Sequence, residues 1–208
     1  MHQMNSNVKI HPQKPYSASC DQNREPILEL IQPLLKDKKT VLEIGSGTGQ
    51  HAVYFSQKMP HLIWKTSDQL AYHEGIKLWL NEAGLNNTPP PIPLDVSNDQ
   101  WPEIIVDVIF SANAVHIMSW QNVIDFLENA PKLLAAKGLL ILYGPFNYAG
   151  KYTSESNKQF DDWLKQQNPQ SAIRDFEAVN KLAEKQDLKL LNDYAMPANN
   201  RILCWQKA

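Results

Sequence analysis

Glycine and cysteine are scarce in this sequence of 208 residues. Its 8 glycines are about half of the average share, which is roughly 7%. Its 2 cysteines, Cys20 and Cys204, are too few for a disulfide framework, so we expect a protein of the reducing cytoplasm. No apolar run approaches the roughly 20 residues that span a bilayer, and residues 1–10 lack the apolar core of a signal peptide. We therefore expect no membrane partner.

An excess of charge of either sign is also missing. The formal net charge is -2, and no long basic run occurs. Proteins that bind duplex nucleic acid usually carry a basic face, so nucleic acid is not an expected partner. The histidines and cysteines form no cluster with the spacing of metal ligands, so no metal site is predicted, and His51 is expected to point away from any ligand.

The apolar pattern predicts one α/β domain. Residues 1–22 are polar and aperiodic, which predicts an N-terminal arm. Tyr16 in this arm could act as a lid over a pocket. Residues 23–208 are predicted to form the domain. Strands and helices then alternate, which is typical of a parallel sheet covered on both faces. The last two strands lack a helix between them and should pair antiparallel. The expected strands are 40–44, 62–66, 92–94, 106–111, 139–143, 188–194 and 201–205, and the expected helices are 24–35, 50–59, 70–83, 120–136, 156–167 and 173–186.

Three of the few glycines fall in one five-residue window after the first strand: Gly45, Gly47 and Gly49. A strand that runs through glycines into a helix presents backbone N–H groups to a ligand at the carboxyl end of the sheet. The dinucleotide pattern would need glycine at position 50, where Gln50 stands, and no phosphate-binding lysine follows. Glu43 would repel a phosphate and suits a cationic ligand. S-adenosylmethionine, which carries an ammonium and a sulfonium, fits this description.

The pattern from Glu43 to Gly49 resembles motif I of class I S-adenosylmethionine-dependent methyltransferases. The resemblance implies a Rossmann-like, mostly parallel seven-stranded sheet in the order 3-2-1-4-5-7-6 with a C-terminal antiparallel hairpin. It also implies S-adenosylmethionine as cofactor, with the glycine loop and Thr48 around its methionine part. Asp68, after the second strand, would bind the ribose hydroxyls, or it caps a helix. The remaining implied cofactor residues are Asp95 and Val96 at the adenine, where Asp95 alternatively forms a turn, and Asn113 after the fourth strand.

A closer resemblance covers the chain from about Pro15. The segments that carry it begin at Asn23, Gly47, Asn113, Leu142, Ser156 and Met196. With these segments the chain resembles the domain-of-unknown-function 938 family, which includes the methyltransferase-like 26 group. The resemblance implies a fold and a cofactor but no substrate.

Several residues near the predicted strand ends are candidates for chemistry. His116 could act as a base because histidine titrates near neutral pH, and Tyr143 follows the fifth strand; the alternatives are a packed histidine and a core tyrosine. Phe146 could form a substrate wall. Four polar residues could contact a substrate or simply cap helices and turns: Asn157, Asp161, Asn199 and Asn200.

The predicted function is methyl transfer from S-adenosylmethionine to an acceptor that is a small molecule or a protein side chain. One alternative is a non-catalytic module that binds the cofactor or interacts with a partner. A second alternative, a nicotinamide-dependent oxidoreductase, is disfavoured by Gln50 and Glu43. The sequence does not indicate an oligomeric state.

Overall fold

A seven-stranded sheet forms the centre of the structure, a computed structural model that describes residues 13–98 and 100–208. Strand β9 runs antiparallel to both of its neighbours, β5 and β8, and the other pairs are parallel. Counted among these seven strands along the chain, the order is 3-2-1-4-5-7-6, which confirms the prediction. From edge to edge the strands are β3 (Ile92–Pro93), β2 (Ile63–Asp68), β1 (Thr40–Ile44), β4 (Val106–Ala112), β5 (Leu134–Gly144), β9 (Asn200–Lys207) and β8 (Leu188–Met196).

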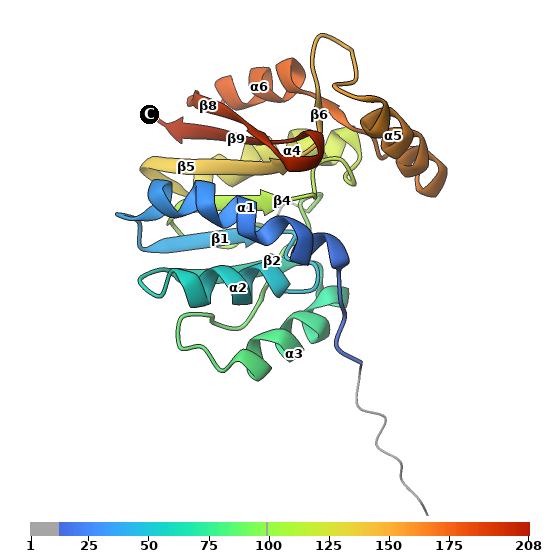
Figure 1. The fold of residues 1–208 in the computed structure, drawn as a ribbon. Helices are drawn as coiled ribbons and strands as arrows, with labels where there is room; N and C mark the ends of the chain where they lie inside the picture. The colour runs from blue at the N-terminus through green and yellow to red at the C-terminus, as the bar shows by residue number, and fades with distance from the viewer. Residues whose placement is uncertain (1–12, 99) are drawn as a thin grey trace, which may run out of the picture.

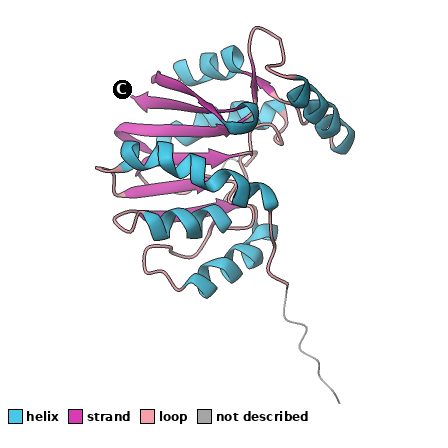
Figure 2. Ribbon diagram, in the orientation of Figure 1, coloured by secondary structure: helices cyan, strands magenta, loops and turns pink. Residues whose placement is uncertain are grey.

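Helices cover both faces of the sheet (Figures 1 and 2). On one face α1 (Ala18–Leu35), α2 (Gln50–Lys58) and α3 (His73–Ala83) share a buried core with Val41 and Ile141. On the other face α4 (Trp120–Asn129) and α6 (Phe176–Glu184) pack on Leu42 and Leu140. Successive strand residues point to opposite faces, so each strand feeds both cores. Helix α5 (Glu155–Gln167) lies beyond the strand ends (Figure 1).

The first helix begins earlier than its predicted start at residue 24. It runs from Ala18 to Leu35 through two prolines, and its buried face includes Ile27 and Ile31. The predicted boundary between residues 22 and 23 therefore falls inside α1. Of the predicted arm, residues 13–17 precede the helix, and residues 1–12 lie outside the described part of the chain.

The predicted helix 120–136 is wrong at its end. Helix α4 stops at Asn129, a 3-10 turn η2 (Ala130–Leu133) follows, and β5 begins at Leu134, which pairs with Val106. Pro131 cannot continue the helical hydrogen bonding. The predicted helices 70–83 and 173–186 begin instead with the 3-10 turn η1 (Leu70–Tyr72) and the short strand β7 (Arg174–Asp175). The strand β6 (Phe146–Asn147), which pairs with β7, and the 3-10 turn η3 (Pro197–Asn199) are absent from the prediction. Within residues 13–98 and 100–208, no helix has both the length and the apolar character that crossing a bilayer demands.

Candidate functional site

The glycine window forms a tight loop between β1 and α2. Gly45, Gly47 and Gly49 have φ values of 76°, 57° and 89°, in the left-handed region that side chains disfavour. A Cβ atom on Gly49 would also lie 3.3 Å from the Cα atom of Ile76 on α3. The loop therefore requires glycine for its backbone conformation and its close packing, which explains why a glycine-poor chain concentrates it here.

Asp68 ties the end of β2 to this loop. Its Oδ2 atom accepts a hydrogen bond from the Gly47 N–H at 2.7 Å, and Oδ1 accepts one from the Gln69 N–H at 2.8 Å. Burial raises the pKa of Asp68, and both backbone donors oppose that rise. The N-cap of α3 is Tyr72, so Asp68 is not the cap of that helix.

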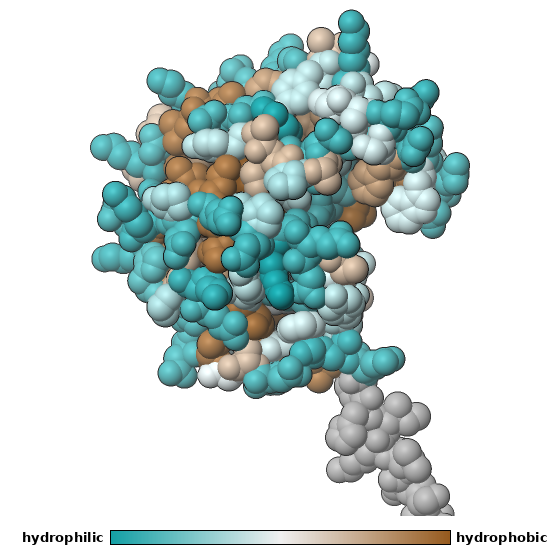
Figure 3. All heavy atoms as spheres, in the orientation of Figure 1, coloured by the Kyte–Doolittle hydropathy of each residue, from teal (hydrophilic) through white to brown (hydrophobic). Residues whose placement is uncertain are grey.

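A cavity of about 800 Å³ opens beside the loop at the carboxyl ends of the parallel strands. Figure 3 shows this side of the molecule hollowed below α5, with apolar atoms at its upper rim. Among the described residues that line the cavity, Asp68 carries the only charge. The predicted cofactor residues that line it are Gly45, Gly47, Thr48, Asp68, Val96 and Asn113.

Glu43 does not line the cavity with these residues. Its side chain is buried in the sheet, 1% exposed, and accepts a hydrogen bond from the Trp64 indole N–H at 3.0 Å. Burial raises its pKa to about 8, against the stabilising effect of the Trp64 hydrogen bond on its charged form. The carboxyl group thus supports the strand under the loop.

Two further strand ends carry predicted cofactor residues. Asp95 forms the turn that was its alternative role: Oδ1 accepts hydrogen bonds from the N–H and hydroxyl of Ser97, at 3.0 and 2.7 Å. Its Oδ2 atom accepts one from the amide of Gln69, a cavity residue, at 3.0 Å. Asn113 is left-handed at φ 56°, and its N–H donates to the Tyr143 carbonyl at 2.8 Å. Gly49 caps α2 but does not line the cavity.

Both catalytic candidates are packed behind the cavity wall. His116 is 5% exposed, its ring meets that of Phe160 edge-on at 5.3 Å, and burial, then Arg174, lowers its pKa to about 4. Tyr143 is 5% exposed in the core under α1, and burial raises its pKa. Neither side chain lines the cavity. Their surroundings are those of a packed histidine and a core tyrosine, the alternatives to a catalytic role.

The substrate candidates also lie outside the cavity lining. Phe146 is a core residue, 2% exposed. Against burial, the pKa of Asp161 is lowered by Lys165, which pairs with it at 2.5 Å, and then by hydrogen bonds from the Tyr152 hydroxyl and the Ile173 N–H. Asn157 donates to the carbonyl of Asn199 and joins α5 to η3, and Asn200 donates to the Pro197 carbonyl. These polar residues hold the segments around α5 together.

Sequence reasoning missed the segment that forms one wall of the cavity. Four consecutive carbonyls, 115–118, each accept a hydrogen bond from residues 171–174. The Val115 carbonyl accepts from Nε of Arg174 at 3.4 Å, and the His116 carbonyl accepts from N of Ala172 at 3.0 Å. The Ile117 carbonyl accepts from Oγ of Ser171 at 2.7 Å, and the Met118 carbonyl accepts from Nη2 of Arg174. Ile117 and Met118 from this segment line the cavity. No local motif signals a contact between segments this far apart.

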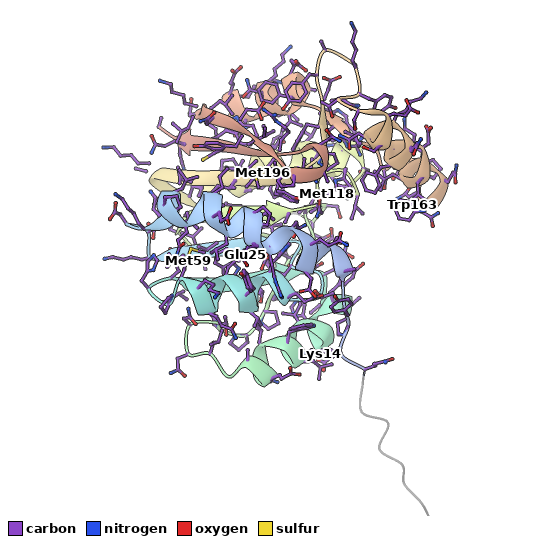
Figure 4. The ribbon with its side chains drawn as sticks, in the orientation of Figure 1. Lys14, Glu25, Met59, Met118, Trp163 and Met196 are labelled. Carbon is purple, nitrogen blue, oxygen red and sulfur yellow. The ribbon has the colours of Figure 1, made fainter. Side chains whose placement is uncertain are left out.

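The start of α1 supplies the opposite wall, in the region where the sequence predicted only a possible lid through Tyr16; Tyr16 itself is 64% exposed and does not line the cavity. Ser17 and Cys20 line the cavity, together with His51 of α2, which was expected to point away. The Gln50 side chain accepts a hydrogen bond from the Ser17 N–H at 2.6 Å and donates to the Ser17 carbonyl at 3.3 Å. In Figure 4, Lys14 lies against α3 and Met118 lies toward α5. Cys20 and Asn23 lie one helical turn apart and so share a face of α1, but no sequence signal pairs that face with His51.

No group of three or more His, Cys, Asp or Glu side chains in the described part of the chain could hold a metal ion.

Comparisons with known proteins agree on the fold. A family described as a protein of unknown function, DUF938, matches residues 14–207. An O-methyltransferase family protein from Burkholderia thailandensis is 12% identical with a TM-score of 0.76, over 89% of this chain and 58% of its own. The S-adenosylmethionine-dependent methyltransferase SibL is 18% identical with a TM-score of 0.77, over 91% of this chain and 55% of its own. A putative O-methyltransferase from Nostoc punctiforme is 14% identical with a TM-score of 0.76, over 88% of this chain and 55% of its own. This chain thus spans little more than half the length of these proteins, whose fold it shares.

Proposed function

Because the chain belongs to the DUF938 family and has the fold of class I methyltransferases, we propose that it is an S-adenosylmethionine-dependent methyltransferase. The observation that carries the proposal is the cavity beside a left-handed glycine loop, in which the described lining residues include no lysine or arginine. A ligand with phosphates would find no cation there. The sulfonium and ammonium of S-adenosylmethionine need none, and its carboxylate can accept hydrogen bonds from backbone N–H groups where the loop enters α2. Within the family, we also propose the methyltransferase-like 26 group, on the sequence motifs.

The residues of the cavity suit the parts of this cofactor. The two Asp68 oxygens match two vicinal ribose hydroxyls, and Val96 offers an apolar surface to the adenine. Gly45, Gly47 and Thr48 would surround the methionine part, with Asn113 opposite. Of the predicted residues outside the lining, Asp95 would act through Gln69, while Glu43 and Gly49 hold the loop. When bound, the cofactor supplies a methyl group activated by its sulfonium.

The two alternatives differ in what the cavity must contain. The dinucleotide pattern would need glycine at position 50 for close packing of the helix on the strand, where the Gln50 side chain is instead engaged with Ser17. A module that only binds the cofactor would need no space beside the methyl group. The cavity continues to Met118 and Gln170, so we propose that it also admits an acceptor, a small molecule or a protein side chain. Cys20 and Cys204 are free thiols, which supports the proposed cytoplasmic location.

Calorimetric titration of the full chain with S-adenosylhomocysteine tests the proposal. We expect binding by the wild-type protein and an affinity loss of about tenfold in Asp68→Asn, which corresponds to about 1.4 kcal/mol. The matched control is Asp107→Asn, because Asp107 accepts hydrogen bonds from Lys39 and Thr40 at the start of β1, away from the cavity. Tight binding of NADH without binding of S-adenosylhomocysteine would contradict the proposed function.

A further inference from the structure

His51 is held in a fixed orientation at the cavity wall. Its ring stacks on Phe55 with centroids 5.3 Å apart and meets Phe110 edge-on at 6.4 Å. Its Nε2 atom lies 2.7 Å from Oδ1 of Asn23, and its Nδ1 atom lies 4.0 Å from the Cys20 sulfur. Cys20 and His51 both line the cavity. The nitrogen on the cavity side is therefore Nδ1.

The hydrogen-bond partners determine which nitrogen carries the proton. An amide oxygen only accepts, so the His51 Nε2 atom must donate to Asn23, and in the neutral ring Nδ1 is then a bare acceptor. A thiol is a weak donor, and here its sulfur lies 4.0 Å away. His51 is only 6% exposed. A buried acceptor with so weak a partner is poorly satisfied, and a stronger donor from a ligand would correct this.

The charged groups around His51 keep this part of the cavity neutral. Burial lowers the pKa of His51 to about 4; Arg24 lowers it further and Asp21 opposes this. Arg24 and Asp21 pair with each other at 2.6 Å. Burial raises the pKa of the Cys20 thiol, with Glu43 adding to the rise, and burial raises that of Tyr143 beside Asn23. The side chains that face His51 from α1, β1 and β5 thus leave no unpaired charge for a charged ligand.

We propose that the cavity binds an uncharged, largely apolar molecule whose hydroxyl or N–H group donates a hydrogen bond to Nδ1 of His51. The proposal rests on the proposed function in taking this molecule to be the methyl acceptor. Ile117 and Met118 supply the apolar surface, and no described lysine or arginine lines the cavity to pair with a carboxylate or phosphate on the acceptor. Asn23 and His51 together act as positioning residues that orient the donor group.

Three naphthalene probes separate the parts of this proposal in calorimetric titrations of the full chain, with and without saturating S-adenosylhomocysteine. 2-Naphthol offers one donor and no charge, 2-methoxynaphthalene removes the donor, and 6-hydroxy-2-naphthoate adds a carboxylate. We expect 2-naphthol to bind about tenfold more tightly than either analogue, equivalent to about 1.4 kcal/mol, because 2-methoxynaphthalene leaves Nδ1 without a donor and 6-hydroxy-2-naphthoate brings an unpaired charge. Equal affinities, or no binding by 2-naphthol, would overturn the proposal.

A histidine variant tests the assigned acceptor. His51→Phe keeps an aromatic ring against Phe55 and should weaken 2-naphthol binding by about tenfold while changing that of 2-methoxynaphthalene by less than about twofold. The matched control is His61→Phe, since the His61 side chain meets the Leu35 carbonyl outside the cavity lining. Unchanged 2-naphthol affinity in a folded His51→Phe protein would refute the acceptor role.

NMR of isotope-labelled histidine in the wild-type protein gives a readout that needs no variant. We expect the His51 resonances of a ring protonated at Nε2 and bare at Nδ1, and a shift of Nδ1 alone when 2-naphthol is added. Protonation at Nδ1 would overturn the proposal. The separate titration with S-adenosylhomocysteine distinguishes the outcomes: if it fails while 2-naphthol still binds through His51, only the proposed function is lost.

Discussion

Glu43 places a carboxyl group inside the sheet, and its charge should make the stability of the protein depend on pH. Burial raises its pKa to about 8, above the value of an unfolded chain. The stabilising contribution of such a group is complete below its unfolded pKa and is lost as the pH rises through the folded pKa. We expect the stability of the wild type relative to Glu43→Gln to fall from about pH 5 to about pH 8, by at most about 1.4 kcal/mol per pH unit.

Urea unfolding across that pH range measures the free energy of unfolding of both proteins. Glutamine keeps an acceptor for the Trp64 indole N–H, so the comparison isolates the charge. The control is Glu128→Gln at an exposed position of α4. A free-energy difference between wild type and Glu43→Gln that stays constant with pH would show that Glu43 keeps an ordinary pKa.

Single residues differ in how far the sequence determines their place. The glycine spacing predicted the loop because it demands a local backbone conformation that the structure shows at Gly45 and Gly47. For Tyr143 there was no comparable signal: residues 139–143 are apolar throughout, so alternation does not reveal which face each side chain takes. Ile141 and Tyr143 turn toward α1, and Leu142 turns toward α4.

At the scale of elements, Arg174 joins β7 to the segment that forms a cavity wall. It donates to the carbonyls of Val115 and Met118, and burial lowers its pKa. We expect Arg174→Met to lower the free energy of unfolding by about 2 kcal/mol, because hydrogen bonds to charged groups are lost from a half-buried site. Hydrogen exchange should accelerate in residues 113–119.

The matched control for this variant is Arg201→Met. Arg201 pairs with Asp193 at 2.7 Å within the β8–β9 hairpin, so its loss removes a comparable contact elsewhere. Exchange in residues 113–119 should then stay at the wild-type rate. If both variants accelerate exchange there equally, the bonds of Arg174 do not hold this segment in place.

Elements with an apolar period and clear stops were predicted more accurately than elements whose ends depend on distant contacts, for a physical reason. Helix α2 and strand β1 have an apolar period and clear stops, so their predicted bounds nearly match the structure. The pair β6 and β7 has two residues in each strand, and such strands form only because distant segments meet. Residues 134–136, the start of β5, were predicted as helix. In the structure Leu134 pairs with Val106 in the sheet, and this long-range pairing outweighs the local helical pattern.

At the scale of the whole molecule, the chain connections between strands predict the sheet order. They do not predict that residues 13–20 lie against the cavity. Parallel units and a short final hairpin restrict the possible orders, and the resemblance selected the one observed. Residues 13–20 instead cross to the cavity through long-range contacts. The Trp79 indole N–H donates to the Pro15 carbonyl at 2.7 Å, and Lys14 lies over the Trp79 ring at 3.6 Å. From a polar, aperiodic segment the sequence predicted a possible lid through Tyr16, but not these contacts of Lys14 and Pro15 with Trp79.

This docking predicts how substitution of Gly75, on α3, should affect ligand release. A Cβ atom there would lie 2.6 Å from Cγ of Pro15, whose rigid ring must move, although alanine favours the helix itself by about 1 kcal/mol. Since Pro15 lines the cavity, we expect Gly75→Ala to speed S-adenosylhomocysteine dissociation in stopped-flow measurements by about tenfold, equivalent to about 1.4 kcal/mol. The double variant with Pro15→Ala removes the clashing Cγ atom and should restore much of the slow release. A release rate that Gly75→Ala leaves unchanged would mean that residues 13–17 do not retain the ligand.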